Sequence, residues 1–482
     1  MGADIGTTRC KAAIFDTELN LISVAYKTFP ISLSSLTHKG LDPQIAFNIV
    51  LNTMKDTIDG LQFRPRNIEG IGFTGQVSTF VPIDSQNKPL TNFIPYFDGR
   101  AKAQLQKIKT RVGEETILEI NYKKPSMVSI EPKVLWIKDN LPDIYDRTNK
   151  FIHLKDYIIL QLTDELVTDY SNASCNLSFD IKKGRFSEAL LKSVGICPRK
   201  MINEIRFSTE CVGKLKKELA DFLGLQWGIP IIVGGFDDAV AMVGMGIVQS
   251  EICGDISGTN TCLDLTIDHI FSDYKMGTQL FCHAIPRKYL LFSGVSLTGY
   301  TLDWFKKEFL EGSFLTSQGK IKRKEAEKLI VIPAFEKRGA GIFGLTTNCN
   351  KVDLYQALLE GIAFKIREHI ELLNKAGFRI RKIRSCGGGA KNKIWGQIKA
   401  NIVGLPIELM EIDEAGVLGA GLLAGVGIGF YEDIFEAIRN LVRVKCRINF
   451  SHKEHKKYNK LFVRYKKLRR MYELSFLDME CI

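Results

Sequence analysis

Two short turns rich in glycine and hydroxyl side chains, about 250 residues apart, place the strongest constraint on how this chain folds. The first turn, Gly6-Thr7-Thr8, comes between an opening strand and a second predicted strand over 11–15. The second turn, Ser257-Gly258-Thr259-Asn260-Thr261, lies in the same way between predicted strands over 252–256 and 262–265. This repetition predicts an internal duplication, with two similar α/β domains over 1–247 and 248–482.

The first turn carries the residue types that bind the phosphates of a nucleotide. Gly6 lets the backbone come close to a ligand, and Thr7 and Thr8 offer O–H and N–H donors. Lys11 is a point charge for an anionic oxygen, and Asp4 can hold Mg²⁺ directly or through water. Taken alone, an ordinary β-turn with flanking charges explains the same residues. Phosphates held by both turns would lie in a cleft between the two domains.

Length and composition favour a folded chain with more than one core. The chain has 482 residues, of which 45% are hydrophobic. No window approaches about 18 uncharged apolar residues, and the first turn leaves no room for a signal peptide, so we expect a soluble, cytoplasmic protein without a membrane segment. The eleven cysteines are scattered and form no C-x-x-C pair, which favours reduced thiols over zinc ligands or disulfides.

The formal net charge of +12 raises the question of nucleic-acid binding. Much of the excess lies over 445–470, and no basic block interleaved with aromatic residues accompanies it. We therefore favour a solvated basic surface over a nucleic-acid site, and attraction of an anionic substrate such as ATP is compatible with either. The sequence leaves open whether the chain forms a homodimer.

Between the two turns, apolar runs with strand spacing and helix spacing alternate along the chain. Strands are predicted over 21–28, 68–74, 79–83 and 230–233, and helices over 42–61, 132–138 and 156–162. Residues 167–174 are polar and are expected to form a loop. Strands that alternate with helices are typical of α/β folds, in which ligands gather at the carboxyl ends of the strands.

Polar side chains follow the strand over 68–74. Gln76 and Ser78 are therefore candidate contacts for a polar ligand, although a hydrogen-bonded turn explains them equally well. Further along, Asp98 and Arg100 combine an acceptor with several donors, which suits a polyhydroxylated ligand. An aspartate helix cap beside a surface arginine, with the helix beginning near Arg100, gives the same pattern.

Two acids, Asp237 and Asp238, follow a glycine turn and begin a helix of small residues over 239–246. The positive field at a helix N-terminus keeps the acids ionised and favours one of them as the acceptor of a substrate proton. A helix cap with a second acid that complements the helix dipole is the alternative explanation.

The second half of the chain repeats these features. The run Gly387-Gly388-Gly389-Ala390-Lys391-Asn392 lies between a predicted strand over 383–386 and a helix that begins at Trp395. Glycines before a helix N-terminus let the backbone approach a base, a ribose or an α-phosphate. A small-residue helix over 416–425 mirrors the one over 239–246, and both suit close packing or a hinge. From Tyr431 onward we expect helices.

With these parts in this order, the chain resembles the FGGY carbohydrate kinases of the actin-like ATPase superfamily. Residues 340–345, 353–354 and 357–360 match the C-terminal signature of that family at all but one position, Leu358, and residues 128–140 match the N-terminal signature loosely. The resemblance implies two actin-like (ribonuclease H-like) domains with an interdomain cleft. It also implies ATP-dependent, Mg²⁺-dependent phosphorylation of a hydroxyl of a small sugar or polyol.

The resemblance is strongest to the xylulose kinases of the family, and it implies a role for each candidate. Asp237 aligns with the catalytic base by its spacing to Gly244, and Asp238 is the less favoured base, a cap or a secondary metal contact. The remaining implied sites are Asp4 for magnesium; Thr7, Thr8, Lys11, Gly258, Thr259, Gly388, Gly389, Ala390 and Asn392 for ATP; and Gln76, Ser78, Asp98, Arg100, Asp237 and Asp238 for the sugar.

The sugar-side residues depart from that pattern at two places. Val77-Ser78 stands where Met-His is frequent, and Tyr96-Phe97 replaces a Trp-Asn pair. The resemblance implies a ketopentose such as xylulose, and because the departures lie on the sugar side, ribulose, glycerol and erythritol stay open as alternatives. An actin-like or chaperone-like switch gated by nucleotide is a further alternative, against which the joint presence of Gln76, Asp98 and Asp237 argues.

Overall fold

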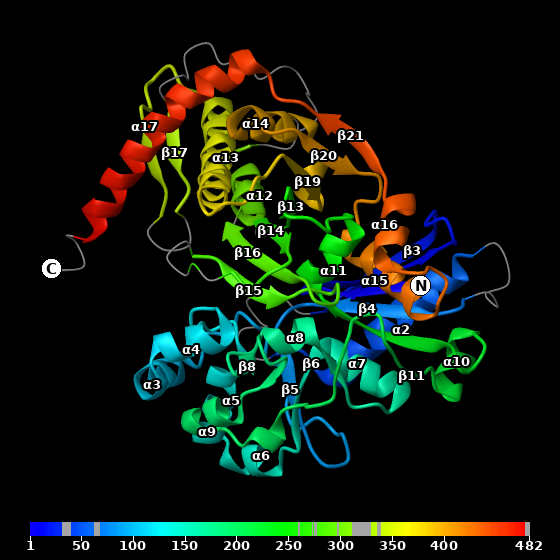
Figure 1. Ribbon diagram of the computed structural model, residues 1–482. Coiled ribbons are helices and arrows are strands. Elements are labelled where there is room, and N and C mark those ends of the chain that lie inside the picture. Colours follow the sequence, from blue (N-terminus) through cyan, green and yellow to red (C-terminus); the bar gives the residue numbers. More distant parts are fainter. Residues whose placement is uncertain are drawn as a thin grey trace. The chain divides into compact units, whose positions relative to one another are not determined.

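The computed structural model describes residues 1–30, 40–61, 68–258, 261–271, 273, 277–295, 298–310, 329–334 and 339–477. The chain forms two compact units (Figure 1). The first unit contains Met1–Val248, Thr266–Phe292 and Glu414–Val442, and the second contains Gln249–Leu265, Ser293–Asp413 and Arg443–Ile482. The first unit thus includes two segments that follow residue 248 in the sequence. No helix of the described ranges is both long enough and apolar enough to cross a membrane.

A six-stranded sheet forms the centre of the first unit, with its strands in the order β11-β12-β4-β1-β2-β3. Its strands are β1 (Gly2–Ile5), β2 (Arg9–Phe15), β3 (Leu21–Thr28), β4 (Ile71–Gly75), β11 (Cys211–Lys214) and β12 (Pro230–Phe236). The strands β1, β4 and β12 run parallel, whereas β2 runs antiparallel to β1 and completes the predicted hairpin. Every residue of β4 is buried, as expected for a parallel strand covered on both faces.

Helices cover this sheet. Helix α2 (Pro43–Asp59) packs on β2 and β3 and begins after Asp42, whose side chain accepts hydrogen bonds from two backbone N–H groups of the first turn. Helix α15 (Ala415–Gly427) packs against β1 and β4, and also against α11 (Asp237–Gly244) (Figure 1). Both α11 and α15 are the small-residue helices predicted from the sequence.

Glycine lets α11 and α15 approach each other closely. A Cβ at Gly244 would lie 2.0 Å from the carbonyl oxygen of Ala415, and a Cβ at Gly419 would lie 2.0 Å from that of Val240. A Cβ at Gly2 would likewise lie 2.1 Å from the carbonyl oxygen of Val417. A larger residue would push the backbones apart, so this packing accounts for the small-residue pattern.

Short strands and helices make up the rest of the first unit. They are β5 (Phe80–Ile83), α3 (Lys102–Val112), α4 (Glu114–Asn121), α5 (Ile130–Asn140), α6 (Pro142–Arg147), β6 (Lys150–His153), α7 (Leu154–Thr163), β7 (Thr168–Asp169), α8 (Tyr170–Ser174), β8 (Phe179–Asp180), β9 (Arg185–Phe186), α9 (Glu188–Val194), β10 (Ile205–Arg206), α10 (Lys217–Leu223), β15 (Gln279–Cys282), β16 (Tyr289–Val295, which ends in the second unit) and α16 (Ile434–Leu441). The prediction of a loop over 167–174 is wrong. The segment contains the short helix α8, which Asp169 caps by accepting hydrogen bonds from two backbone N–H groups.

The second unit is built on a sheet with strands in the order β14-β13-β19-β20-β21. These strands are β13 (Ile252–Ser257), β14 (Thr261–Ile267), β19 (Lys382–Cys386), β20 (Ile407–Met410) and β21 (Val444–Ile448). The other elements are α12 (Thr298–Phe309), β17 (Ile330–Ile332), β18 (Gly341–Phe343), α13 (Lys351–Lys375), the short turn η5 (Gly388–Lys391), α14 (Lys393–Val403) and α17 (His452–Leu477).

The two sheets share one plan. In each, a hairpin strand pairs antiparallel with the first strand (β2 with β1, β14 with β13), two parallel strands follow (β4 and β12, β19 and β20), and an antiparallel strand ends the row (β11, β21). The correspondence supports the internal duplication predicted from the sequence. The two sheets differ in how the last strand is connected along the chain: β11 precedes its neighbour β12 in the sequence, whereas β21 follows its neighbour β20.

Candidate active site

Three adjacent parallel strands of the first unit end at the same edge of its sheet. Ile5 of β1 pairs with Gly75 of β4, and Gly75 pairs with Phe236 of β12. The next residue after β4 is Gln76, and the next after β12 is Asp237. Because neighbouring strands lie about 4.8 Å apart, Gln76 and Asp237 leave the sheet beside the first glycine-threonine turn. This is the edge at which α/β proteins bind ligands.

The first turn is bonded directly to Gln76. Gln76 Oε1 accepts hydrogen bonds from Thr79 Oγ1 at 3.0 Å and Thr7 Oγ1 at 3.4 Å. Gln76 Nε2 donates to the carbonyl oxygen of Gly6 at 3.4 Å. Thr8, the second threonine of the turn, is exposed. The side chain of Gln76 thus connects the predicted sugar side to the predicted phosphate side.

Asp4, Lys11 and Glu414 form a charged cluster next to this turn. Lys11 Nζ makes an ion pair with Glu414 Oε2, which the sequence analysis did not predict. Burial raises the pKa of Asp4 to about 6; Lys11 opposes the rise and Glu414 adds to it. Asp4 Oδ1 is buried and makes no hydrogen bond within the part of the chain that the structure describes. Such a carboxylate oxygen suits a divalent cation.

Asp237 and Asp238 occupy the first turn of α11. Asp237 Oδ1 accepts a hydrogen bond from the backbone N–H of Asp238 at 3.2 Å. Burial raises the pKa of Asp237 well above the usual range, and the negative charges of Asp238 and Asp4 raise it further. A partly buried carboxylate with a raised pKa, close to a second acid, is suited to accept a proton.

Asp98 and Arg100, predicted as separate ligands, bind each other. Asp98 is fully buried, and the guanidinium of Arg100 lies 2.7 to 2.9 Å from its two carboxylate oxygens. The backbone N–H of Arg100 also donates to Asp98 at 2.9 Å, and the guanidinium lies 4.9 Å from the centre of the Trp136 ring. The carboxylate therefore sets the orientation of Arg100, and α3 begins two residues later than the predicted start near Arg100.

Ser78 lies in the turn after β4 with a φ of 51°, in the left-handed region. Its side chain is fully buried, and its hydroxyl oxygen has no hydrogen-bond partner among the residues that the structure describes. A buried hydroxyl without a partner is costly, so a polar ligand at this position would satisfy it.

In the second unit, a buried network lies beneath the second glycine-rich turn. Asp255 of β13 accepts hydrogen bonds from Ser257 Oγ at 2.6 Å and from Ser385 Oγ at 2.8 Å. Lys399 of α14 makes an ion pair with the same carboxylate. Gly258 follows this network and is exposed, whereas the predicted ligand Thr259 lies outside the described residues.

The glycine run before α14 combines packing with an open position. A Cβ at Gly387 would lie 2.7 Å from the carbonyl oxygen of Ser257, and a Cβ at Gly389 would lie 2.8 Å from the Ser257 side chain. Gly388 is exposed, and a Cβ there would meet no described atom within 4 Å. A side chain at either outer glycine would therefore collide with Ser257, whereas the space beside the middle glycine is open.

The last two predicted adenosine residues have structural contacts. Asn392 caps α14, because its side chain accepts hydrogen bonds from the N–H groups of Ile394 at 3.0 Å and Trp395 at 3.1 Å. Ala390 is buried. These contacts account for both residues in the structure, and their roles toward a nucleotide stay predictions.

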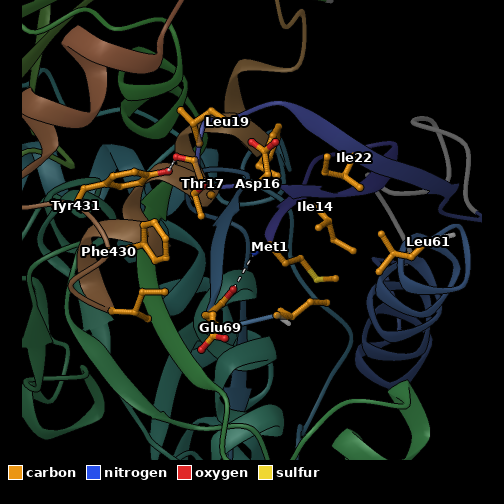
Figure 2. Close-up of a pocket in the computed structure, with 16 residues that line it drawn as sticks. Met1, Ile14, Asp16, Thr17, Leu19, Ile22, Leu61, Glu69, Phe430 and Tyr431 are labelled. Carbon is orange, nitrogen blue, oxygen red and sulfur yellow. Dashed lines mark hydrogen bonds between the residues drawn. The ribbon is translucent and has the colours of Figure 1, made fainter. Parts of the chain in front are cut away.

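A cavity of about 340 Å³ lies at the opposite end of β1 (Figure 2). It is lined by Met1 and Gly70, at the amino ends of two parallel strands, together with apolar side chains that include Phe15 and Phe430. Two of the lining residues are hydrogen-bonded to each other: the hydroxyl of Tyr431 donates to the carbonyl oxygen of Thr17 at 3.0 Å (Figure 2). None of the predicted site residues lines this cavity.

Two further groups of residues at the site were not predicted from the sequence. These are Glu414, which pairs with Lys11, and the buried group Lys155, Asp169 and Ser171 behind β12. Asp169 carried a usable signal, because aspartate is one of the residues preferred at the N-cap of a helix. Glu414 directly precedes a small-residue helix, which gives no hint of its partner.

No cluster of three or more histidine, cysteine or acidic side chains able to hold a metal occurs in the described ranges. The ten described cysteines are free. Burial raises the pKa of Cys10 to about 12, so this thiol in the first hairpin serves packing.

Comparison with known proteins fits this geometry. Residues 1–244 match the N-terminal domain of the FGGY family of carbohydrate kinases, and residues 256–428 match its C-terminal domain. A xylulose kinase from Staphylococcus epidermidis is 26% identical over 476 residues, which cover 96% of this chain and 94% of that protein. A glycerol kinase from Thermococcus kodakarensis is 28% identical over 453 residues, 90% of each chain.

The fold agrees with a solved structure as well. The crystal structure of a ligand-bound xylulose kinase from Lactobacillus acidophilus matches with a TM-score of 0.88 over 99% of both chains, at 24% identity. The family match extends over both units. The chain therefore belongs to the FGGY family of carbohydrate kinases, enzymes that use ATP to phosphorylate their substrate.

Proposed function

We propose that this kinase transfers the γ-phosphoryl group of MgATP to a hydroxyl of a ketopentose, with xylulose as the first candidate. The observation that carries the proposal is the common edge of β1, β4 and β12, from which Gln76 and Asp237 leave the sheet beside the first turn. A base and a phosphate-binding turn at one edge are what phosphoryl transfer to an alcohol requires.

Asp237 is the proposed base. Its ionised carboxylate accepts the proton of the sugar hydroxyl while the hydroxyl oxygen attacks the γ-phosphorus, and ADP leaves from the opposite side. The raised pKa of Asp237, caused by burial and then by the charges of Asp238 and Asp4, supports this role because it makes the carboxylate a stronger base.

The proposed phosphate side includes Thr7, Thr8 and Lys11, with Asp4 toward Mg²⁺. The unsatisfied Asp4 Oδ1 supports this assignment, since Mg²⁺ is usually held by one or two carboxylates together with phosphate oxygens. In the second unit we assign Gly258, Thr259, Gly388, Gly389, Ala390 and Asn392 to the nucleotide.

The proposed sugar side includes Gln76, Ser78, Asp98, Arg100 and Asp238. The buried, unsatisfied hydroxyl of Ser78 supports a polar ligand at this position. The xylulose kinase relative favours a ketopentose. The glycerol kinase relative, at similar identity, keeps glycerol as the second candidate. Ribulose and erythritol are tested alongside these two.

The test is ADP formation from MgATP by the full chain with each of D-xylulose, L-xylulose, D-ribulose, glycerol and erythritol, with the phosphorylated product identified by mass spectrometry. We expect D-xylulose to stimulate ADP formation most, at least a hundredfold over the rate without sugar. Greater stimulation by glycerol would replace the ketopentose by the second candidate. Stimulation by none of the five compounds would overturn the proposed acceptor class.

A further inference from the structure

Strand β12 is irregular just before the proposed base. Its pairing with β4 shifts register between Ile232 and Gly235. Gly234 has a φ of 65°, and a Cβ there would lie 1.6 Å from the carbonyl oxygen of Phe73. A bulge of this kind bends a strand and re-aims the side chain that follows, and bulges are frequent next to active sites.

The two N–H groups inside the bulge are bonded outside the β4 ladder. Val233 N–H donates to the carbonyl oxygen of Glu210 at 3.1 Å, and Gly234 N–H donates to that of Ser208 at 3.1 Å. Both acceptors belong to the segment that leads into β11. Both backbone donors of the bulge are therefore satisfied by the segment before β11, which fixes the bulge in the fold.

Two buried side chains hold the bulge from the other side. Lys155 Nζ donates to the carbonyl oxygen of Val233 at 2.9 Å. Ser171 Oγ accepts the backbone N–H of Phe236, the residue before the proposed base, at 3.0 Å. A Cβ at Gly235 would lie 2.6 Å from Ser171 Oγ, so the hydroxyl fits closely against the glycine.

Asp169 links these two side chains. Its Oδ2 lies 3.1 Å from Lys155 Nζ, and its Oδ1 accepts the N–H of Ser171 at 2.8 Å as well as the Ser171 hydroxyl. Asp156 Oδ1 lies 2.6 Å from the same ammonium. All four side chains are at most 1% exposed. Burial would lower the pKa of Lys155, but Asp156 and Asp169 outweigh it and raise the pKa above its usual value.

We propose that Ser171, held by Asp169 and Lys155, is a positioning residue that aims the Asp237 carboxylate at the substrate hydroxyl. The hydroxyl of Ser171 fixes the backbone N–H of Phe236, the residue before Asp237, and Lys155 fixes the carbonyl of Val233 in the bulge. Loss of either bond lets the junction between β12 and α11 shift. This inference rests on the proposed function, in which Asp237 is the base.

The test is the variant Ser171→Ala in the full chain, with the matched control Ser174→Ala. Both serines are fully buried and lie on α8, but Ser174 bonds to the carbonyl oxygen of Ser171 and to the N–H of Cys282 rather than to β12. The turnover number is measured with MgATP and the most active sugar of the panel, ADP affinity by calorimetry, and the melting temperature by scanning calorimetry.

If the base is displaced from the substrate hydroxyl, kcat falls while nucleotide affinity is unchanged. We expect Ser171→Ala to lower kcat about tenfold or more while ADP affinity stays within twofold, because small displacements of a reacting group are costly. Ser174→Ala keeps kcat within twofold of wild type at a similar loss of melting temperature. Asp169→Asn, which keeps the side-chain size, gives the same selective loss of kcat and replaces Ser171→Ala if that variant does not fold.

A kcat within twofold of wild type for Ser171→Ala, or an equal loss in Ser174→Ala, would overturn the positioning role. The variant Asp237→Asn, assayed in parallel, separates this failure from failure of the proposed function. If Asp237→Asn is inactive and Ser171→Ala is normal, only the positioning inference fails. If Asp237→Asn is fully active, the proposed base itself is wrong.

Discussion

Glu414 and Lys11 form an ion pair although 403 positions separate them in the sequence. Lys11 is part of the hairpin of β1 and β2, and Glu414 directly precedes α15, which packs on that hairpin. Glu414 thus pairs with Lys11, a cationic side chain that we assign to the phosphate side of the site. Both side chains are partly exposed, with 18% and 39% of their surface accessible, so breaking the pair costs little.

Replacing Glu414 is therefore expected to strengthen nucleotide binding. Glu414→Gln releases Lys11 and removes a negative charge next to Asp4, and we expect the KM for MgATP to fall by up to about fivefold, the equivalent of about 1 kcal/mol. Steady-state kinetics at varied MgATP checks this. Glu411→Gln, an exposed position on the same loop, makes the same change in net charge and should leave KM unchanged. A higher KM in Glu414→Gln would contradict this assignment of Lys11.

The pH dependence of turnover reports on Asp237. Because the base must be ionised, kcat falls as the pH drops through the raised pKa of Asp237, well above the range of an ordinary carboxylate. Asp238→Asn removes a neighbouring negative charge, so it should lower the pKa of Asp237. The acid limb of the profile, in which kcat falls with pH, should then move to lower pH. Asp238→Glu keeps the charge and should keep the limb in place. A limb unaffected by Asp238→Asn would exclude Asp237 as its origin.

Asp4 is expected to lower the stability of the nucleotide-free protein at neutral pH. Its pKa is raised from 3.8 to about 6 on folding, so its favourable contribution is present below pH 4 and is lost as the pH rises through 6. Asp4→Asn should therefore melt at a higher temperature than wild type at pH 7.5, and the difference should shrink toward pH 4. The same variant should lose activity with MgATP. A lower melting temperature at pH 7.5 would show that the ionised carboxylate is stabilised in the fold.

Close packing of α11 on α15 predicts a steep effect at Gly419. A Cβ there would lie 2.0 Å from the carbonyl oxygen of Val240, which cannot move without the helix, so Gly419→Ala should cost about 3 kcal/mol in the free energy of unfolding. On the same helix, Gly421→Ala would meet only the ring of Phe15 at 2.9 Å, and that ring borders the cavity of Figure 2. Its cost should be smaller. Urea unfolding of both variants measures the difference, and equal costs would contradict the packing argument.

Much of the fold could be predicted because its signals are local. The hairpins, the strand at 68–74, the helix after Asp42 and both small-residue helices follow from periodicity, caps and turns within about ten residues. The family is confirmed by the matches to both of its domains, and the α/β fold class is confirmed by the solved structure.

The errors arise where distant parts of the chain decide the local structure. Strand β21 (Val444–Ile448) was expected to be helical, but it pairs with β20 at the edge of the second sheet, and this pairing overrides the local sequence. The ion pair between Asp98 and Arg100 was missed for a different reason: the two residues are only two positions apart, but each side chain was assigned to the ligand. Ser171 gave no sign of its bond to Phe236, which lies 65 residues away in the sequence.

The most direct test of the account is the rate of phosphoryl transfer by Asp237→Asn, measured in a single turnover with MgATP and the sugar that the wild-type enzyme phosphorylates best. The substitution keeps the shape of the side chain and removes its basicity. We predict a rate at least a hundredfold lower than that of wild type, with ADP affinity within threefold, because a general base contributes about 10² to 10⁴. Transfer at the wild-type rate would contradict the account.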